Sequence, residues 1–281
     1  MKKTGRSGKI VKRLIFDLFL LVIIIVVIYP FVIMISGSFK TDLEMNRAPL
    51  RIFPQDGTAD NYRTLFTAIP FWRQFGNSFM VSAAYALLTM LFSGGVAYGF
   101  TRFERFRGKN ILFSFILGTM LIPPQVYLVP AFQMYRALHF FGTYLPMLIP
   151  ALMNSFGIFL VRQVMSQVPR ELYESATIDG CGELYIFTRI AIPLSVSGLG
   201  ILGVLNFMTC WNDFMTPLIY LNQEAMYTLP IGLMRLQNFY KISYGAPLAG
   251  AFLSCVPVII ILTVVGQKYF IRGLMAGAVK G

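Results

Sequence analysis

The sequence predicts an all-α polytopic membrane protein, and three observations support this fold class. Hydrophobic residues make up 56% of the chain and charged residues only 13%, about half of the roughly 25% that is usual in soluble domains. Several apolar runs are long enough to cross a hydrocarbon layer, which takes about 20 helical residues. The basic residues lie between these runs, as topology signals do, and do not form one patch for a nucleic acid.

Six segments qualify as membrane spans of a single transmembrane domain over residues 1–281. Helices are expected because lipid offers no hydrogen-bond partners to backbone groups. Prolines predict kinks near Pro123–Pro124, Pro217 and Pro257. The predicted spans are residues 14–36, 77–100, 110–134, 143–162, 190–221 and 246–270.

The Lys and Arg residues predict how these spans are oriented. Roughly two thirds of the 24 bases lie in the first 13 residues, in the connections after the second and fourth spans, and in the C-terminal tail. Cytoplasmic segments carry such an excess. We therefore expect a bacterial or archaeal plasma membrane protein with both termini in the cytoplasm. The first span is interpreted as a permanent helix, because its apolar run is too long for a signal peptide.

An acid-rich segment, ELYESATIDGCGELYIFTRIAIP, interrupts the apolar runs on the predicted cytoplasmic side. Arg170–Asp179 is predicted to form a short helix that ends at Gly180 in a left-handed conformation. Glu183–Ile192 is predicted to form a second amphipathic helix. We call residues 170–189 the elbow. Its acids would be repelled by anionic headgroups, which favours docking to a partner protein over resting on the membrane.

The spacing within the elbow resembles a known family motif. Glu174–Ala176, three residues, Gly180, nine residues and Ile190–Pro193 resemble the EAA loop of ATP-binding-cassette (ABC) importer permeases. That loop reads Glu-Ala-Ala, three residues, Gly, nine residues, Ile-x-Leu-Pro. Ser175 and Ile192 depart from it by small changes. The position before the fifth of six spans also agrees.

Further motifs resemble the carbohydrate branch of these permeases, and their order resembles the second permease subunit of maltose-type importers. The resemblance covers nearly the whole chain and is least clear over residues 37–75. The motifs are Ile122–Gln125, Asn154–Leu160, Trp211–Phe214, Tyr227–Pro230 and the ending Gly273–Gly281.

The resemblance implies a type I ABC importer permease fold and a set of partners. Such a subunit moves a carbohydrate, here expected to be an oligosaccharide, by alternating access. It works with a homologous second permease subunit, two ATPase subunits, an extracytoplasmic sugar-binding protein and membrane lipid, and with no nucleic acid. The chain has no Gly-x4-Gly-Lys-Ser/Thr loop. We therefore expect no enzyme and no bound cofactor or metal, with ATP and Mg used by the partner subunits.

By the same resemblance the elbow is the coupling helix, and Glu174 would bond a base on the ATPase. The tail from Arg272 would also reach that interface, and the loop between the fifth and sixth spans would reach the binding protein. The residues expected to dock the ATPase are Leu172, Tyr173, Glu174, Ser175, Ala176, Asp179 and Gly180.

A polar row in the fifth span has two interpretations. In one, Trp211 stacks on a sugar ring and Asn212 bonds its hydroxyls. In the other, Asp213 is structural and bonds backbone or the sister permease near the outer surface, because buried acids usually need fixed partners. The candidate substrate-path residues are Gln125, Asn154, Ser155, Asn206, Trp211 and Asn212.

Two other functional classes fit the sequence less well. An ion-coupled secondary transporter usually shows paired intramembrane charges and repeated broken helices, for which Asp213 alone is thin support. A membrane enzyme would need a reactive cluster, whereas the chain has one histidine, His139, and three scattered cysteines. The cysteines are interpreted as packing residues.

Overall fold

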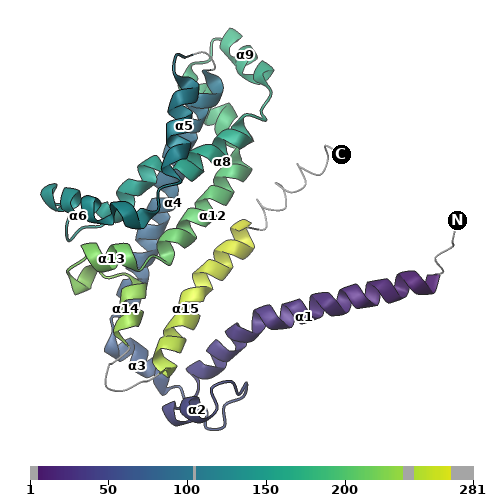
Figure 1. The fold of residues 1–281 in the computed structure, drawn as a ribbon, viewed down its shortest axis with the longest axis vertical. Helices are drawn as coiled ribbons and strands as arrows, with labels where there is room; N and C mark the ends of the chain where they lie inside the picture. The colour runs from purple at the N-terminus through teal and green to yellow at the C-terminus, as the bar shows by residue number, and fades with distance from the viewer. Residues whose placement is uncertain (1–5, 104–105, 237–243, 267–281) are drawn as a thin grey trace. The chain divides into compact units, whose positions relative to one another are not determined.

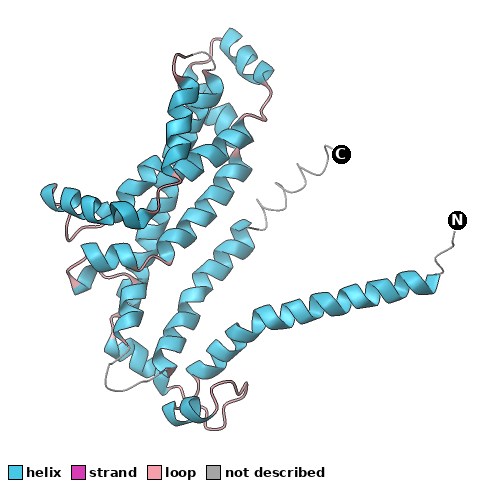
Figure 2. Ribbon diagram, viewed as in Figure 1, coloured by secondary structure: helices cyan, strands magenta, loops and turns pink. Residues whose placement is uncertain are grey.

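The computed structural model describes residues 6–103, 106–236 and 244–266, and every regular element in these ranges is a helix (Figures 1 and 2). The predicted all-α class is thereby confirmed. The chain divides into two compact units, which we describe separately. The first comprises Met1–Phe71 and Leu233–Cys255, and the second comprises Trp72–Gly232 and Val256–Gly281.

The first unit contains α1 (Arg6–Ser38), α2 (Asp42–Arg47), α3 (Asp60–Ala68) and most of α15 (Gly245–Ile261). A buried lysine organises the loop that follows α1. Lys40 is fully buried, and its ammonium donates to the carbonyl oxygens of Ala48 and Pro49 at 3.3 and 3.0 Å and to that of Arg51. Burial lowers the pKa of Lys40. The carbonyls replace the water that a buried charge loses.

The second unit forms a helical bundle in which α5 and α12 both pack against α8 (Figure 1). Close packing depends on small residues: a Cβ at Gly198 of α12 would come within 2.7 Å of Val164 Cγ2 on α8. The helices of this unit are α4 (Phe71–Arg102), α5 (Lys109–Thr119), α6 (Leu128–Ala137), α7 (Leu145–Leu148), α8 (Ser155–Met165), α9 (Arg170–Ile178), α10 (Glu183–Ile186), α11 (Ile192–Leu194), α12 (Val196–Trp211) and α13 (Met215–Tyr220); α14 (Leu229–Arg235) begins in it.

Within the described ranges, four continuous segments are long and apolar enough to cross a membrane, and two bent pairs raise the number to as many as six, the number that the sequence predicts. The continuous segments are Lys12–Ser38, Phe71–Arg102, Leu145–Met165 and Gly245–Val264. The predicted spans 14–36 and 77–100 lie within the first two, and the predicted span 143–162 overlaps the third but begins two residues before it.

The two bent pairs are bent more sharply than the kinked spans that the sequence predicts. Lys109–Thr119 and Pro124–Ala137 meet at 89°, so the expected kink at Pro123–Pro124 is a full break. Glu183–Leu194 and Val196–Trp211 meet at 77°, which the sequence analysis did not predict. The cause is local: a π-helical stretch, Phe187–Ala191, precedes Pro193, which lacks an N–H for the helical ladder.

The predicted span 190–221 is therefore wrong as one helix. The chain breaks again after Trp211, and α13 begins at Met215, ahead of the kink expected at Pro217. Pro257 lies inside α15. The end of the predicted span 246–270 and the tail from Arg272 lie outside the described residues.

Candidate functional site

The elbow begins with α9, and two residues, Pro169 and Gly180, set its ends. Pro169 precedes the helix, and Gly180 ends it with a φ of +80°. The N–H of Cys181 donates to the carbonyl of Ala176 at 2.9 Å and that of Gly180 to Thr177 at 3.1 Å, closing the helix C-terminus as left-handed glycine caps do. The expected stop at Gly180 is confirmed. The second predicted helix, Glu183–Ile192, is divided into α10, the π-helical stretch and α11.

One face of α9 packs against the bundle. Tyr173 and Ala176 are 5% and 7% exposed and belong to a core cluster with Tyr98 of α4, Met165 of α8 and Leu199 of α12. The rings of Tyr98 and Tyr173 lie 6.3 Å apart, edge to face. The hydrophobic core therefore continues from the bundle into the elbow.

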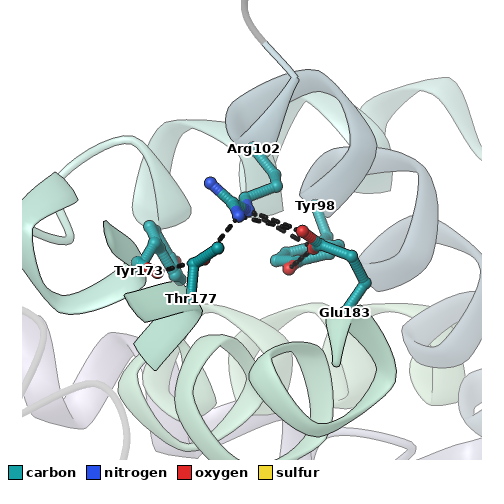
Figure 3. A network of polar contacts seen from close by, with 5 residues as sticks. All are labelled: Tyr98, Arg102, Tyr173, Thr177 and Glu183. Carbon is teal, nitrogen blue, oxygen red and sulfur yellow. Dashed lines mark hydrogen bonds and ion pairs between the residues drawn. The ribbon is translucent and has the colours of Figure 1, made fainter. Parts of the chain in front are cut away.

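A polar network holds the same face (Figure 3). Arg102, at the end of α4, donates from Nη2 to Glu183 Oε1 at 2.9 Å and to Thr177 Oγ1 at 2.9 Å. Its Nε donates to the same Glu183 oxygen at 3.1 Å, and Tyr98 donates to the other at 2.5 Å. Thr177 in turn donates to the carbonyl of Tyr173 at 2.8 Å. We call Tyr98, Arg102, Thr177 and Glu183 the clamp, because they join α4 to both helices of the elbow.

The clamp could not be predicted from the sequence. Arg102 is one of the bases that follow the second predicted span, and Glu183 lies in the second predicted amphipathic helix. The two lie 81 residues apart, and a single sequence offers no periodicity at such a distance.

The other face of α9 carries the docking candidates. Leu172, Glu174, Ser175, Asp179 and Gly180 are exposed, whereas Tyr173 and Ala176 are buried. The two buried residues anchor the helix, so direct docking remains a prediction for the five exposed ones. Ile178, which the sequence analysis did not single out, is 85% exposed. An apolar side chain at that exposure fits a contact with another protein.

Most of the substrate-path candidates bond within the chain. Asn154 caps α8 by accepting from the N–H of Gly157 at 2.7 Å, and it donates to Asn206 Oδ1 at 2.9 Å. Asn206 donates to the carbonyl of Leu202 at 2.9 Å. The hydroxyls of Ser155 and Thr119 are 2.6 Å apart. These contacts join helices and give the polar groups partners, as buried polar groups require.

Trp211 does not offer a face for a sugar ring within this chain. It is 4% exposed, stacks on Phe207 at 5.6 Å and meets Phe75 edge to face at 5.3 Å. Asn212 is exposed, but its amide donates back to the carbonyl of Met208 at 2.8 Å. Gln125 is exposed in the short 3₁₀ turn between α5 and α6.

Asp213 does not lie deep in a span, as the sequence suggested, but in the break between α12 and α13. Its Oδ1 accepts from the backbone N–H of Thr216 at 3.2 Å, in line with the structural interpretation. Beside it lies a mainly apolar cavity of about 280 Å³. Its lining includes Tyr85, Tyr127, Tyr135 and Tyr220. We call it the tyrosine cavity; no motif marks these tyrosines in the sequence.

Comparison with known proteins identifies the family to which the chain belongs. A family model described as "Binding-protein-dependent transport system inner membrane component" matches residues 92–275. The chain belongs to this family. The resemblance drawn from the elbow spacing is thus confirmed, as is a multi-pass location in the membrane.

Curated relatives match this permease over nearly its full length. The arabinooligosaccharides transport system permease protein AraQ of Halalkalibacterium halodurans is 37% identical over 259 residues, 91% of this chain and 92% of the relative. AraQ of Bacillus subtilis is 35% identical over 274 residues, with 96% and 97% covered.

A solved structure confirms the type I importer fold. It is a bacterial ABC transporter involved in the import of the acidic polysaccharide alginate, with a TM-score of 0.81 at 22% identity. The match covers 96% of this chain and 100% of that one.

Proposed function

We propose that this permease carries a carbohydrate, in particular an oligosaccharide, into the cell by alternating access. Separate ATPase subunits drive it, a homologous permease completes the gate, and an extracytoplasmic binding protein delivers the sugar. The names of the relatives, which transport arabinooligosaccharides, support this substrate class. Support for the binding protein comes from the solved alginate transporter in complex with a pentasaccharide-bound periplasmic protein.

The observation that carries the proposal is the contrast between the two faces of α9. The inner face is fixed by packing and by the clamp, while the outer face presents acids beside exposed Leu172 and Ile178. A short helix that is held on one side and offers apolar and acidic groups on the other suits a groove with apolar and basic groups. We assign that groove to the ATPase, which places the elbow and both termini in the cytoplasm.

The clamp connects the docked ATPase to the helical bundle, so that movement of one displaces the other. Movement of a docked ATPase displaces α9, and the bonds of Arg102 and Glu183 pass the displacement to α4. Rigid-body rotation of helical units is a common route between two conformations. Nucleotide chemistry belongs to the partner, because this chain has no phosphate-binding glycine loop in its sequence.

The tyrosine cavity is our candidate for this subunit's part of the sugar path. Tyrosine rings stack on apolar faces of other groups while their hydroxyls form hydrogen bonds, and Asp213 adds a strong acceptor at the same cavity. Exposed Asn212 and Gln125 remain candidates. Asn154, Asn206 and Trp211 are better explained as supports of the helices around it.

Substitution of Glu174 tests the docking assignment. In the complex purified from its host through a tag on this chain, Glu174→Ala should reduce sugar-stimulated ATP hydrolysis about tenfold or more, because losing a charge-assisted bond is worth about 1.5–3 kcal/mol. Glu171→Ala, an exposed acid on the same helix, is the matched control and should stay within about twofold. Equal hydrolysis in both variants would count against the role of Glu174. Sugar accumulation by vesicles that contain this chain alone would contradict the whole proposal.

A further inference from the structure

The lining of the tyrosine cavity carries charge of one sign. Among the described residues that line it, Asp213 is the only charged one, and none is lysine, arginine or histidine. Arg136 follows Tyr135 in α6, but it is exposed and lies outside the lining. The cavity therefore presents one carboxylate, and otherwise neutral groups, to a molecule that enters it.

The carboxylate of Asp213 is not neutralised by a base in the described part of the chain. Its Oδ1 accepts from the backbone N–H of Thr216 at 3.2 Å, and the ion pairs of the described residues do not include it. The side chain is half-buried, and its Oδ2, which has no hydrogen-bond partner among these residues, is not enclosed. A negative charge is thus held in the lining by the backbone, with one oxygen still available as an acceptor.

The tyrosines add hydroxyls that both donate and accept hydrogen bonds. Tyr135 and Tyr220 are only 7% and 5% exposed, but their hydroxyls are not enclosed and form no hydrogen bond within the described part of the chain. Their rings lie edge to face at 5.4 Å, which fixes them. Tyr127 is 50% exposed in the same lining. Hydroxyls of this kind, together with one carboxylate, pair well with the hydroxyls of a neutral sugar.

An acidic sugar would meet a different environment in the same space. The cavity of about 280 Å³ is near the lower end of the roughly 300–1,000 Å³ of ligand pockets, so a charge inside it cannot lie far from Asp213. Like charges repel strongly where the surroundings are mainly apolar. The described lining also offers no base that could pair with an incoming carboxylate.

We propose that the tyrosine cavity selects uncharged saccharides and that Asp213 excludes acidic ones such as uronates. The inference rests on the proposed function, since it assumes that the sugar passes through this cavity. The fold alone does not make the choice, because the solved transporter with the same fold is involved in the import of an acidic polysaccharide.

The experiment uses the complete complex without its binding protein, so that the selectivity of the binding protein does not enter. The complex is purified through a tag on this chain, placed in nanodiscs and titrated with neutral arabinotriose and galactotriose and with trigalacturonate, which carries a carboxylate on each ring. Saturation-transfer difference NMR gives the dissociation constants. The tighter of the two neutral probes should bind about tenfold or more better than trigalacturonate.

Two substitutions should close this gap. Asp213→Asn removes the charge and keeps an acceptor for the N–H of Thr216. Thr209→Lys places an ammonium one helical turn before Asp213 in the same lining, where it can neutralise the carboxylate. In both variants trigalacturonate should bind about tenfold or more tighter than in the unchanged complex. Glu224→Gln is the matched control, because Glu224 is an exposed acid in the following loop and is not part of the lining.

Each outcome decides the proposal. Preference for a neutral probe that is lost in Asp213→Asn or Thr209→Lys, but kept in Glu224→Gln, supports it. Equal binding of neutral and acidic probes, a preference that both variants retain, or binding of no probe overturns it. Tighter binding of chitosan triose, which carries amines, than of the neutral probes would assign Asp213 to a cation and also overturn it. Thermal unfolding of each variant identifies one that fails to fold, and the other then carries the test.

Sugar-stimulated ATP hydrolysis, measured on the same complex with the loaded binding protein added, keeps this result apart from the proposed function. Hydrolysis that responds to sugar, without any preference for neutral probes, refutes the role of Asp213 alone. A preference for neutral probes in a complex whose hydrolysis never responds to sugar refutes the transport proposal and leaves a saccharide-binding cavity.

Discussion

Two bends of the second unit, the elbow and the break between α12 and α13, are fixed by different means. At the elbow, Gly180 turns the chain, and Arg102 of α4 pairs with Glu183 of α10 and donates to Thr177 of α9. At the other bend, Asp213 caps the backbone of Thr216, and Trp211 packs between the rings of Phe207 and Phe75. The elbow adds an ion pair to its packing against the bundle, whereas the other bend is held mainly by aromatic packing.

The difference follows from the surroundings of each bend. The side chains of Arg102 and Glu183 are 19% and 45% exposed, so their charges keep part of their hydration and the pair carries little desolvation cost. The α12–α13 bend has one short cap and rings that leave the tyrosine cavity beside them. The clamp thus favours a rigid elbow, whereas the other bend lies beside the tyrosine cavity, which we propose as part of the sugar path.

Of the changes that test the difference between the two bends, reversing the charge of Arg102 should have the largest effect. Arg102→Glu places two acids together and removes the bonds to Glu183 and Thr177, so we expect sugar-stimulated ATP hydrolysis by the complex to fall about tenfold or more. The double variant Arg102→Glu, Glu183→Arg should recover part of the loss. The measurement is steady-state hydrolysis with and without the loaded binding protein.

Arg107→Glu is the control for this change, because Arg107 is an exposed base in the same connection. If Arg107→Glu and Arg102→Glu behave alike, net charge and not the clamp explains the effect.

A methyl group at Gly180 should have the next largest effect. Gly180 has a φ of +80° and Gly182 a φ of −71°, and neither added Cβ meets a described atom within 4 Å. Gly180→Ala therefore tests backbone strain alone, which is about 1–2 kcal/mol for a left-handed residue, and Gly182→Ala is its matched control. Thermal unfolding of the complex and its hydrolysis per sugar transported should change only for Gly180→Ala. Equal changes in both variants would mean that the left-handed turn is not required.

The cap at the second bend should give the smallest effect. Asp213→Ala removes the acceptor for Thr216 N–H and should lower stability by about 1 kcal/mol, whereas Asp213→Asn should retain most of it. Thermal unfolding measures this difference. ATP hydrolysed per sugar should stay unchanged in Asp213→Asn, because asparagine keeps an acceptor both for the cap and at the tyrosine cavity. A loss of coupling in Asp213→Asn would erase the distinction between the two bends.

The elbow was accessible to sequence analysis and the clamp was not, for a physical reason. Glu174 and Gly180 belong to a local pattern, since a short helix and its glycine stop depend on neighbouring residues. The pairing of Arg102 with Glu183 depends on how α4 packs, which a single sequence does not specify. Trp211 shows the same limit: beside Asn212 and Asp213 it suggested a sugar contact, and packing against Phe75 placed it in the core.

The first helix has a different relation to its environment. The segment Lys12–Ser38 has 27 residues; its most apolar 18-residue window has a mean hydropathy of 3.3, and none of that window is buried by this chain. The apolar run without a charge covers residues 18–35 and is about 27 Å long at 1.5 Å per residue, close to a hydrocarbon thickness of about 30 Å. The tilt of such a helix is set by neighbouring helices and by bilayer thickness. The inclination of this helix is therefore a property that the membrane and its neighbours impose, and it will differ between thin and thick bilayers.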